Sequence, residues 1–97
     1  MPSAGKGWLE RAVAGLDGWR LEGDFLVKTF EFETFMDGIR FVGRVARIAE
    51  RLEHHPDVHI RYTSIKLALQ SHDVGGVTER DVRLAGAIDK SLKAAAG

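Results

Sequence analysis

The run from Val58 to Asp73 alternates between apolar and polar side chains, and it constrains the fold more than any other segment. Successive side chains of a strand point to opposite faces, but a strand usually has only about five or six residues. We therefore predict a hairpin that turns near Thr63–Ser64, although no glycine marks the turn. A hairpin joins antiparallel strands, so the sheet is expected to be antiparallel.

The longest predicted helix opens at Thr34, whose side chain can cap the first turn, with Asp37 at the capping-box position. Apolar residues at spacings of three and four predict one buried stripe. The stripe comprises Phe35, Ile39, Val42, Val45/Ala46, Ala49 and Leu52, with Met36, Phe41 and Ile48 at its margins. Pro56 is expected to force the end of the helix, because the residue before a proline is pushed out of helical geometry.

The remaining segments complete a two-layer pattern. We predict a helix over Ser3–Leu16, a short strand at Trp19–Leu21, a strand over Phe25–Glu33 and a last helix that opens at Thr78. The last helix carries Val82, Ala85, Ile88, Leu92 and Ala96 at helical spacing. The order α-β-β-α-β-β-α predicts one α+β domain over residues 1–97, a four-stranded antiparallel sheet with three helices on one face.

Composition limits the class of function. The 97 residues carry 14 basic and 14 acidic side chains, so the formal net charge is zero. A domain that binds nucleic acid through phosphates normally has a basic excess, so that class is not expected, whereas self-association is permitted. Without cysteine, the chain has neither disulfides nor thiolate metal sites. The N-terminus lacks the apolar core of a signal peptide and no run approaches the roughly 20 apolar residues of a membrane span, so we expect a cytoplasmic protein.

Three of the four histidines form the most informative chemical pattern. His54 and His55 directly precede Pro56, and His72 stands just before a Gly–Gly turn. Imidazole is the side chain that most readily exchanges protons near neutral pH. His72 is expected to reach the end of the sheet at which His54 and His55 emerge, and Asp81 stands where it can cap the last helix, orient an imidazole, or both. The pattern indicates acid–base chemistry.

The segments 49–57 and 71–81, with Tyr62 between them, resemble the pterin-4a-carbinolamine dehydratase family. The family pattern has an acidic residue, a His-His-Pro triplet, a downstream aromatic residue, a third histidine and an aspartate in the T/S-E-x-D opening of the last helix. The resemblance runs without gaps from about Thr34 to Leu92. Val58 departs from it, because many members carry an aromatic residue there, and stacking at the pocket rim is expected to differ.

The resemblance implies a dehydratase that uses neither a metal nor a bound cofactor. Its substrate is a 4a-hydroxytetrahydropterin, the spent cofactor of aromatic amino acid hydroxylases, which loses water to give the quinonoid dihydropterin. Histidines can supply both the acid and the base. By the resemblance, His54 and His72 exchange protons and His55 mainly grips the pterin. Further substrate contacts are expected from Glu50, Pro56, Ser71, Asp73 and Asp81. The family also forms dimers by sheet-edge pairing and tetramers by helix packing, which implies a homo-oligomer.

Other interpretations of these residues stay open. His54 and His55 could simply favour the negative end of the helix dipole. Glu50, one turn before His54, could fix that ring or remain a solvated charge. His54, His55 and His72 with a water could instead form a zinc site.

Two alternatives concern larger features. The arginines spaced at three and four along the long helix could be a solvated face or could steer an anionic group. This stripe comprises Arg40, Arg44, Arg47 and Arg51. The whole chain could also be a non-catalytic module on the same fold, a transcriptional dimerisation cofactor or an assembly factor. Retention of all three histidines favours catalysis.

Overall fold

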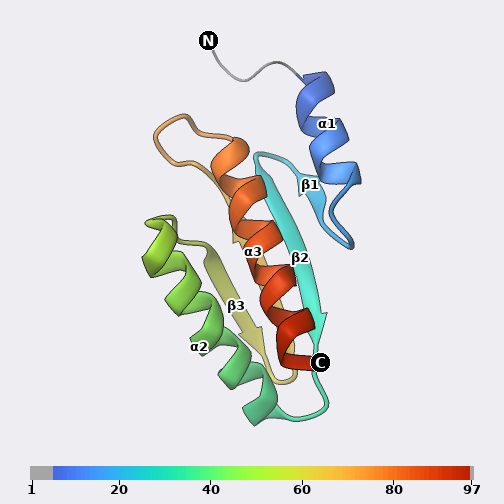
Figure 1. The fold of residues 1–97 in the computed structure, drawn as a ribbon, viewed down its shortest axis with the longest axis vertical. Helices are drawn as coiled ribbons and strands as arrows, with labels where there is room; N and C mark the ends of the chain where they lie inside the picture. Colours follow the sequence, from blue (N-terminus) through green and yellow to red (C-terminus); the bar gives the residue numbers. More distant parts are fainter. Residues whose placement is uncertain (1–5, 97) are drawn as a thin grey trace.

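The computed structural model describes residues 6–96, which form three helices and four strands in the expected order (Figure 1). Along the chain these are α1 (Lys6–Ala14), β1 (Arg20–Glu22), β2 (Phe25–Glu31), α2 (Phe35–Leu52), β3 (Asp57–Arg61), β4 (Ser64–Leu69) and α3 (Glu79–Ala96). The predicted beginning of the first helix, at residues 3–5, lies outside the described residues. No helix within the described range is long and apolar enough to cross a membrane.

The four strands form one antiparallel sheet in the order β1-β2-β4-β3. The predicted hairpin is confirmed, with its turn at Tyr62 and Thr63, but its second strand ends at Leu69 and not at Asp73, so His72 lies beyond the strand. Tyr62 has a positive φ of 52°, so it adopts the left-handed conformation that glycine usually supplies. Because β4 lies between β2 and β3, the chain leaves the end of β2 through α2 and returns at the edge of the sheet.

The core lies between the sheet and the helices. α2 and α3 lie side by side over one face of the sheet, and α1 packs beside α3 and β1 (Figure 1). The sheet contributes Leu26, Phe30, Ile65, Leu67 and Leu69, and α2 and α3 contribute Phe41, Val45, Ile48, Leu84, Ala85 and Ile88. Each large side chain buried in this way stabilises the fold by about 1.5–3 kcal/mol relative to an exposed one.

The buried stripe of α2 is rotated from the predicted one. The buried residues are Gly38, Phe41, Val45, Ile48 and Ala49, so Phe41 and Ile48 lie in the core, not at its margin. Phe35 and Met36 are instead 45% and 52% exposed. The reason is a close approach at Gly38, where a Cβ atom would stand 3.3 Å from Cδ1 of Ile65. The helix therefore turns its glycine towards β4, and periodicity alone could not choose between two overlapping stripes.

The end of α2 also differs from the prediction. The helix ends at Leu52 because Glu53 takes the left-handed conformation, with φ 54° and ψ 42°, and Pro56 comes later. The backbone N–H of His54 then donates to the carbonyl of Ala49 at 3.0 Å, which closes the helix with a C-terminal cap. This reversal directs the chain, and with it His54, towards the beginning of α3.

Candidate active site

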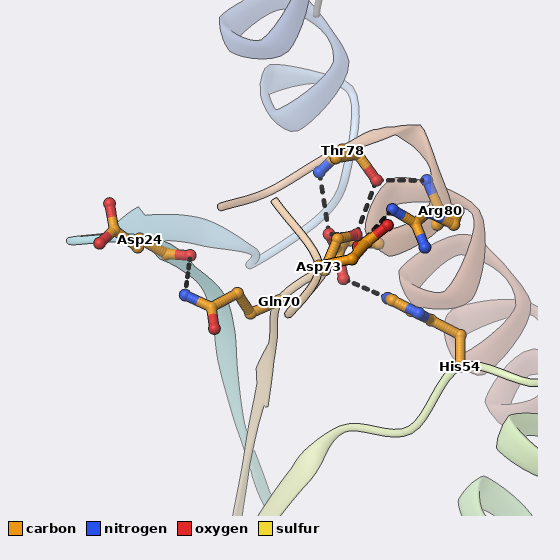
Figure 2. A network of polar contacts seen from close by, with 8 residues as sticks. Asp24, His54, Gln70, Asp73, Thr78 and Arg80 are labelled. Atoms are coloured by element: carbon orange, nitrogen blue, oxygen red, sulfur yellow. Dashed lines mark hydrogen bonds and ion pairs between the residues drawn. The ribbon is translucent and has the colours of Figure 1, made fainter. Parts of the chain in front are cut away.

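His54 leaves the C-terminal end of α2 and reaches a group of polar side chains at the beginning of α3 (Figure 2). Its Nε2 lies 2.5 Å from Oδ1 of Asp81. The side chain of His54 is 11% exposed and that of Asp81 is fully buried. A hydrogen bond to a carboxylate in a site with little water is strong, so this contact fixes the imidazole ring.

Asp81 is itself held from two sides. Its Oδ2 accepts the backbone N–H of Thr78 at 2.9 Å and the hydroxyl of Ser71 at 2.9 Å. The Ser71 hydroxyl also lies 2.7 Å from Oγ1 of Thr78. Since Ser71 gives its one proton to Asp81, Thr78 donates to Ser71. A negative charge at this position, in the first turn of α3, is also favoured by the helix dipole.

The two predicted roles of Asp81 therefore coexist. One oxygen closes the capping box of α3, while the other orients His54. The helical spacing puts Asp81 on the buried face of α3, with Leu84, Ala85 and Ile88 on the same face. This is the face that meets the rest of the fold, so the carboxylate points into the protein and not into solvent.

This arrangement sets the chemistry of the His54 ring. A carboxylate only accepts hydrogen bonds, so Nε2 of His54 carries the proton that is shared with Asp81. In the neutral ring Nδ1 then holds the lone pair and is the atom that can accept a further proton. Once protonated, the ring is an imidazolium stabilised by Asp81 and able to return that proton. Both halves of an acid–base cycle are thus available at one nitrogen.

His55 occupies a different environment. Its ring is 61% exposed, and its Nε2 lies 2.6 Å from Oε2 of Glu50. Of the two alternatives for Glu50, contact with the ring of His54 is wrong, because Glu50 contacts His55. The other alternative, a solvated charge, agrees with the 77% exposure of its side chain. The left-handed Glu53 reverses the chain after α2, so the second histidine, and not the first, returns over the last turn of the helix.

His72 lies on the loop between β4 and α3, beyond the end of β4 at Leu69, and its side chain is exposed. No hydrogen bond or ion pair joins it to another residue of the described part of the chain. Its neighbour Asp73 accepts a hydrogen bond from Nη2 of Arg80 at 2.8 Å, and this bond lowers the pKa of the Asp73 carboxyl. The structure thus joins His54, Ser71, Thr78 and Asp81 by hydrogen bonds, and His72 makes no bond to this network.

The loop that carries His72 is nevertheless well anchored. Ser71 pairs with Gly76 as an isolated antiparallel bridge, and Gly75 has a positive φ of 66°, which suits glycine. The side-chain amide of Gln70 donates to the carbonyl of Asp24 in the β1–β2 turn at 3.2 Å (Figure 2). His72 is therefore presented from a loop with fixed ends.

The part that sequence reasoning missed is the positioning of Asp81 by Ser71. Ser71 was expected to contact substrate, but it is fully buried and bonded to Asp81 and Thr78. A small hydroxyl residue ten positions before the aspartate gives little signal by itself. Only the bridge between Ser71 and Gly76 brings the two side chains together. Pro56 is half-buried between the histidine pair and β3.

The three histidines do not form a metal centre in this structure. Within residues 6–96, no group of three or more histidine, cysteine, aspartate or glutamate side chains is arranged to hold a metal ion. His54 and His55 point to different carboxylates, Asp81 and Glu50.

Comparison with known sequences gives one family. The family model described as pterin 4 alpha carbinolamine dehydratase matches residues 6–91. A protein of Thermomicrobium roseum is 49% identical over 72% of this chain and 75% of its own length. A protein of Chloroflexus aurantiacus is 43% identical over 95% of this chain and 99% of its own length. Both are provisionally named pterin-4-alpha-carbinolamine dehydratases.

Solved structures share the fold. A protein of Brucella melitensis described as a transcriptional coactivator/pterin dehydratase superposes with a TM-score of 0.84 at 29% identity, over 91% of this chain and 96% of its own. A pterin dehydratase-like protein, described as a RuBisCO assembly factor in the alpha-carboxysome, superposes with a TM-score of 0.65 at 22% identity. That match covers 75% of this chain and 87% of the other, and it shows the likeness of fold alone.

Proposed function

This chain belongs to the pterin-4a-carbinolamine dehydratase family, and we propose from that premise that it dehydrates a 4a-hydroxytetrahydropterin to the quinonoid dihydropterin. In the reaction the bond between C4a and the hydroxyl oxygen breaks and water leaves. The neighbouring ring nitrogen loses its proton, and a carbon–nitrogen double bond forms. One proton is given and one is taken, so an acid and a base suffice, and the proposed reaction needs no metal or bound cofactor.

The observation that carries the proposal is the chain of contacts from Ser71 and Thr78 through Asp81 to His54. A buried carboxylate that is fixed by two donors holds the imidazole in one tautomer and one orientation. A purely structural capping aspartate needs no histidine on its second oxygen. We assign proton exchange at the substrate to His54 and His72, and assign binding of the pterin mainly to His55.

The remaining assignments follow from exposure. Glu50 holds His55 over the end of α2, and Asp73 is held by Arg80, so both carboxylates stand at the rim of the site. We propose that these two contact the pterin ring system. Asp81 and Ser71 are fully buried and act through His54, as positioning residues. Pro56 fixes the direction of the chain after the histidine pair.

The direct test is turnover of a 4a-hydroxytetrahydropterin, generated in the assay by an aromatic amino acid hydroxylase and followed by absorbance. Addition of this protein should accelerate the dehydration well above the spontaneous rate. The assay is repeated after exhaustive dialysis against EDTA, and the rate should be unchanged. If EDTA abolished turnover and zinc restored it, a metal mechanism would replace the one proposed.

A second candidate is a binding or assembly module without catalysis. It is favoured by the description of the Brucella melitensis protein as a transcriptional coactivator/pterin dehydratase. Among the described residues His72 makes no side-chain hydrogen bond, and a non-catalytic module would need none. A protein with this function would give no acceleration in the same assay, even with all three histidines intact.

We also propose that the protein is a homo-oligomer. All five residues of the edge strand β3 are exposed, and unpaired edge strands are templates for pairing with another copy. Phe41 and Ile48, at the margins of the predicted stripe of α2, are buried in the core and are not available to another copy. The exposed apolar residues of α2 are instead Phe35 and Met36. These two side chains give α2 an exposed apolar surface against which a second copy can pack.

A further inference from the structure

The groove between α2 and α3 lies outside the proposed active site. It has a volume of about 460 Å³, and the two helices lie side by side in opposite directions (Figure 1). Ile48 and Ala87 give it an apolar floor, and Ser91 lies beside them. Its charged lining residues are Arg44, Arg47, Arg51 and Lys90. None of the described residues that line the groove carries a carboxylate, although the chain as a whole has no net charge.

The cations of the groove are not engaged elsewhere. Among the described residues, none of the four takes part in an ion pair, whereas Arg20, Arg40 and Arg80 each pair with a carboxylate. Nε of Arg44 is buried and has no hydrogen-bond partner within the described chain. An N–H group removed from water without a partner is unfavourable, so the free protein holds Arg44 in an unsatisfied state.

We propose that this groove docks an acidic, amphipathic segment of a protein partner. Arg44, Arg47 and Arg51 share one face of α2 and extend over about 10 Å of its axis. Carboxylates on one face of a helical segment repeat at the same spacing of three and four residues. The apolar side of such a segment would lie on Ile48 and Ala87 while its carboxylates meet the arginines.

Arg44 is the anchor of this docking surface. A carboxylate that approaches side-on can accept from Nε–H and one Nη–H together, and this paired geometry is available to arginine but not to lysine. Rotation of the guanidinium into the groove gives the buried Nε–H the partner that it lacks in the free protein. The zero net charge of the chain argues against a nucleic acid as the occupant, because such ligands select an extended basic surface.

The shape of the groove favours a protein segment over a small ligand. A small-molecule site encloses most of its ligand, whereas this groove is open along its length between the two helices. At 100° per residue, Arg44 and Arg51 lie on the opposite side of α2 from Phe35, so docking in the groove leaves Phe35 uncovered. The inference is independent of the proposed dehydratase activity.

The test uses the full chain and a fluorescein-labelled amphipathic peptide of leucine and glutamate, with binding followed by fluorescence anisotropy. A peptide with glutamine in place of glutamate is the ligand control. The double variant Arg44→Gln/Arg47→Gln should weaken binding of the glutamate peptide by about tenfold or more. The matched variant Arg11→Gln/Arg61→Gln removes the same charge from exposed arginines outside the groove, and it should bind as the wild type does.

Two further variants examine Arg44 itself. Arg44→Lys keeps the charge but not the paired N–H geometry, and it should lose most of the affinity that Arg44→Gln loses. Arg44→Met keeps the stem, and it should leave the Tm of the free protein unchanged or raised, because it removes the unsatisfied donor. A marked fall in Tm would show that Arg44 is structural and would overturn the proposal.

Other results would overturn it as well. Equal weakening by both double variants, or equal binding of the glutamine peptide, would mean that no specific docking occurs. Binding of tripolyphosphate with no binding of the peptide would make the groove a site for small anions. A change in oligomer mass on Arg44→Gln/Arg47→Gln would show that a second copy of the chain fills it.

Discussion

At the scale of single residues, the site depends on Asp81 serving two elements at once. Its two oxygens contact different residues. Oδ2 accepts hydrogen bonds from Thr78 and Ser71, and Oδ1 is hydrogen-bonded to His54. A carboxylate that only capped the helix could be exposed, whereas Asp81 is fully buried. Burial excludes competing water, so the orientation of the imidazole is coupled to the first turn of α3.

We expect His54→Ala and His72→Ala each to lower kcat/KM by about 100-fold or more, the scale of losing a positioned acid or base. Neither should unfold the protein, since His72 is exposed and His54 lies at the margin of the core. Steady-state turnover and a thermal melt measure the two effects. Turnover within about threefold of the wild type for either variant would remove that residue from the mechanism.

Asp81→Asn tests positioning separately from chemistry. The amide can still accept from Thr78, but its NH₂ group can donate to Nε2 of His54, which favours the wrong tautomer. We therefore expect kcat to fall with little change in KM, while α3 keeps its cap. Ser71→Ala is the matched variant, because it removes one donor to Asp81 and should lower the free energy of unfolding by about 1–3 kcal/mol. Equal kcat in Asp81→Asn and wild type would contradict the role.

At the scale of elements, the reversal after α2 places His54 opposite Asp81. The left-handed conformation of Glu53 is disfavoured for a residue with a Cβ atom, by about 1–2 kcal/mol. Glu53→Gly should therefore raise the free energy of unfolding, by less than about 1 kcal/mol after the added chain entropy of glycine is subtracted. Glu53→Val should lower it. Urea denaturation measures both, and a loss of stability in Glu53→Gly would show that the Glu53 side chain matters in its own right.

The ion pair between Asp73 and Arg80 in the loop before α3 predicts how the stability of this loop depends on pH. Arg80 holds the pKa of Asp73 below its ordinary value of 3.8. Because the pKa of Asp73 is lower in the folded chain, the ion pair stabilises the loop at pH values above the ordinary pKa of 3.8. This contribution is lost as the pH falls through the pKa of the folded chain. In Arg80→Gln the pKa of Asp73 should rise towards 3.8, as followed by carboxyl NMR shifts. An unchanged value would mean that the pair does not form in solution.

At the scale of the whole molecule, the sheet has two open edges and the outer side of α2 exposes Phe35 and Met36. Zero net charge puts little repulsion in the way of self-association. Light scattering at micromolar concentration should therefore give the mass of a dimer or a tetramer, with the dimer favoured. Ile60→Asp on β3 and Met36→Glu on α2 test the two surfaces separately. A wild-type mass near 10.7 kDa would mean a monomer and would refute the prediction.

The sequence by itself determined the order of the elements and the antiparallel sheet, because alternation, capping residues and turn residues act locally. It also determined the family, because the His-His-Pro triplet, the third histidine and the T-E-x-D opening can be recognised from the order and spacing of residues alone. The sequence also predicted that Asp81 caps the last helix, because a capping box depends only on two residues three positions apart.

Only the tertiary structure decided which partners those residues meet. The choice of stripe on α2 depends on Gly38 approaching Ile65, a contact between distant segments. The pairing of Glu50 with His55 depends on the left-handed Glu53, which no composition rule indicates. The bond from Asp81 to His54 spans 27 residues, and it forms because α2 ends beside the beginning of α3. Contacts of this kind depend on the packing of whole elements. For that reason the sequence pattern predicted which residues belong to the site but not which of them contact one another.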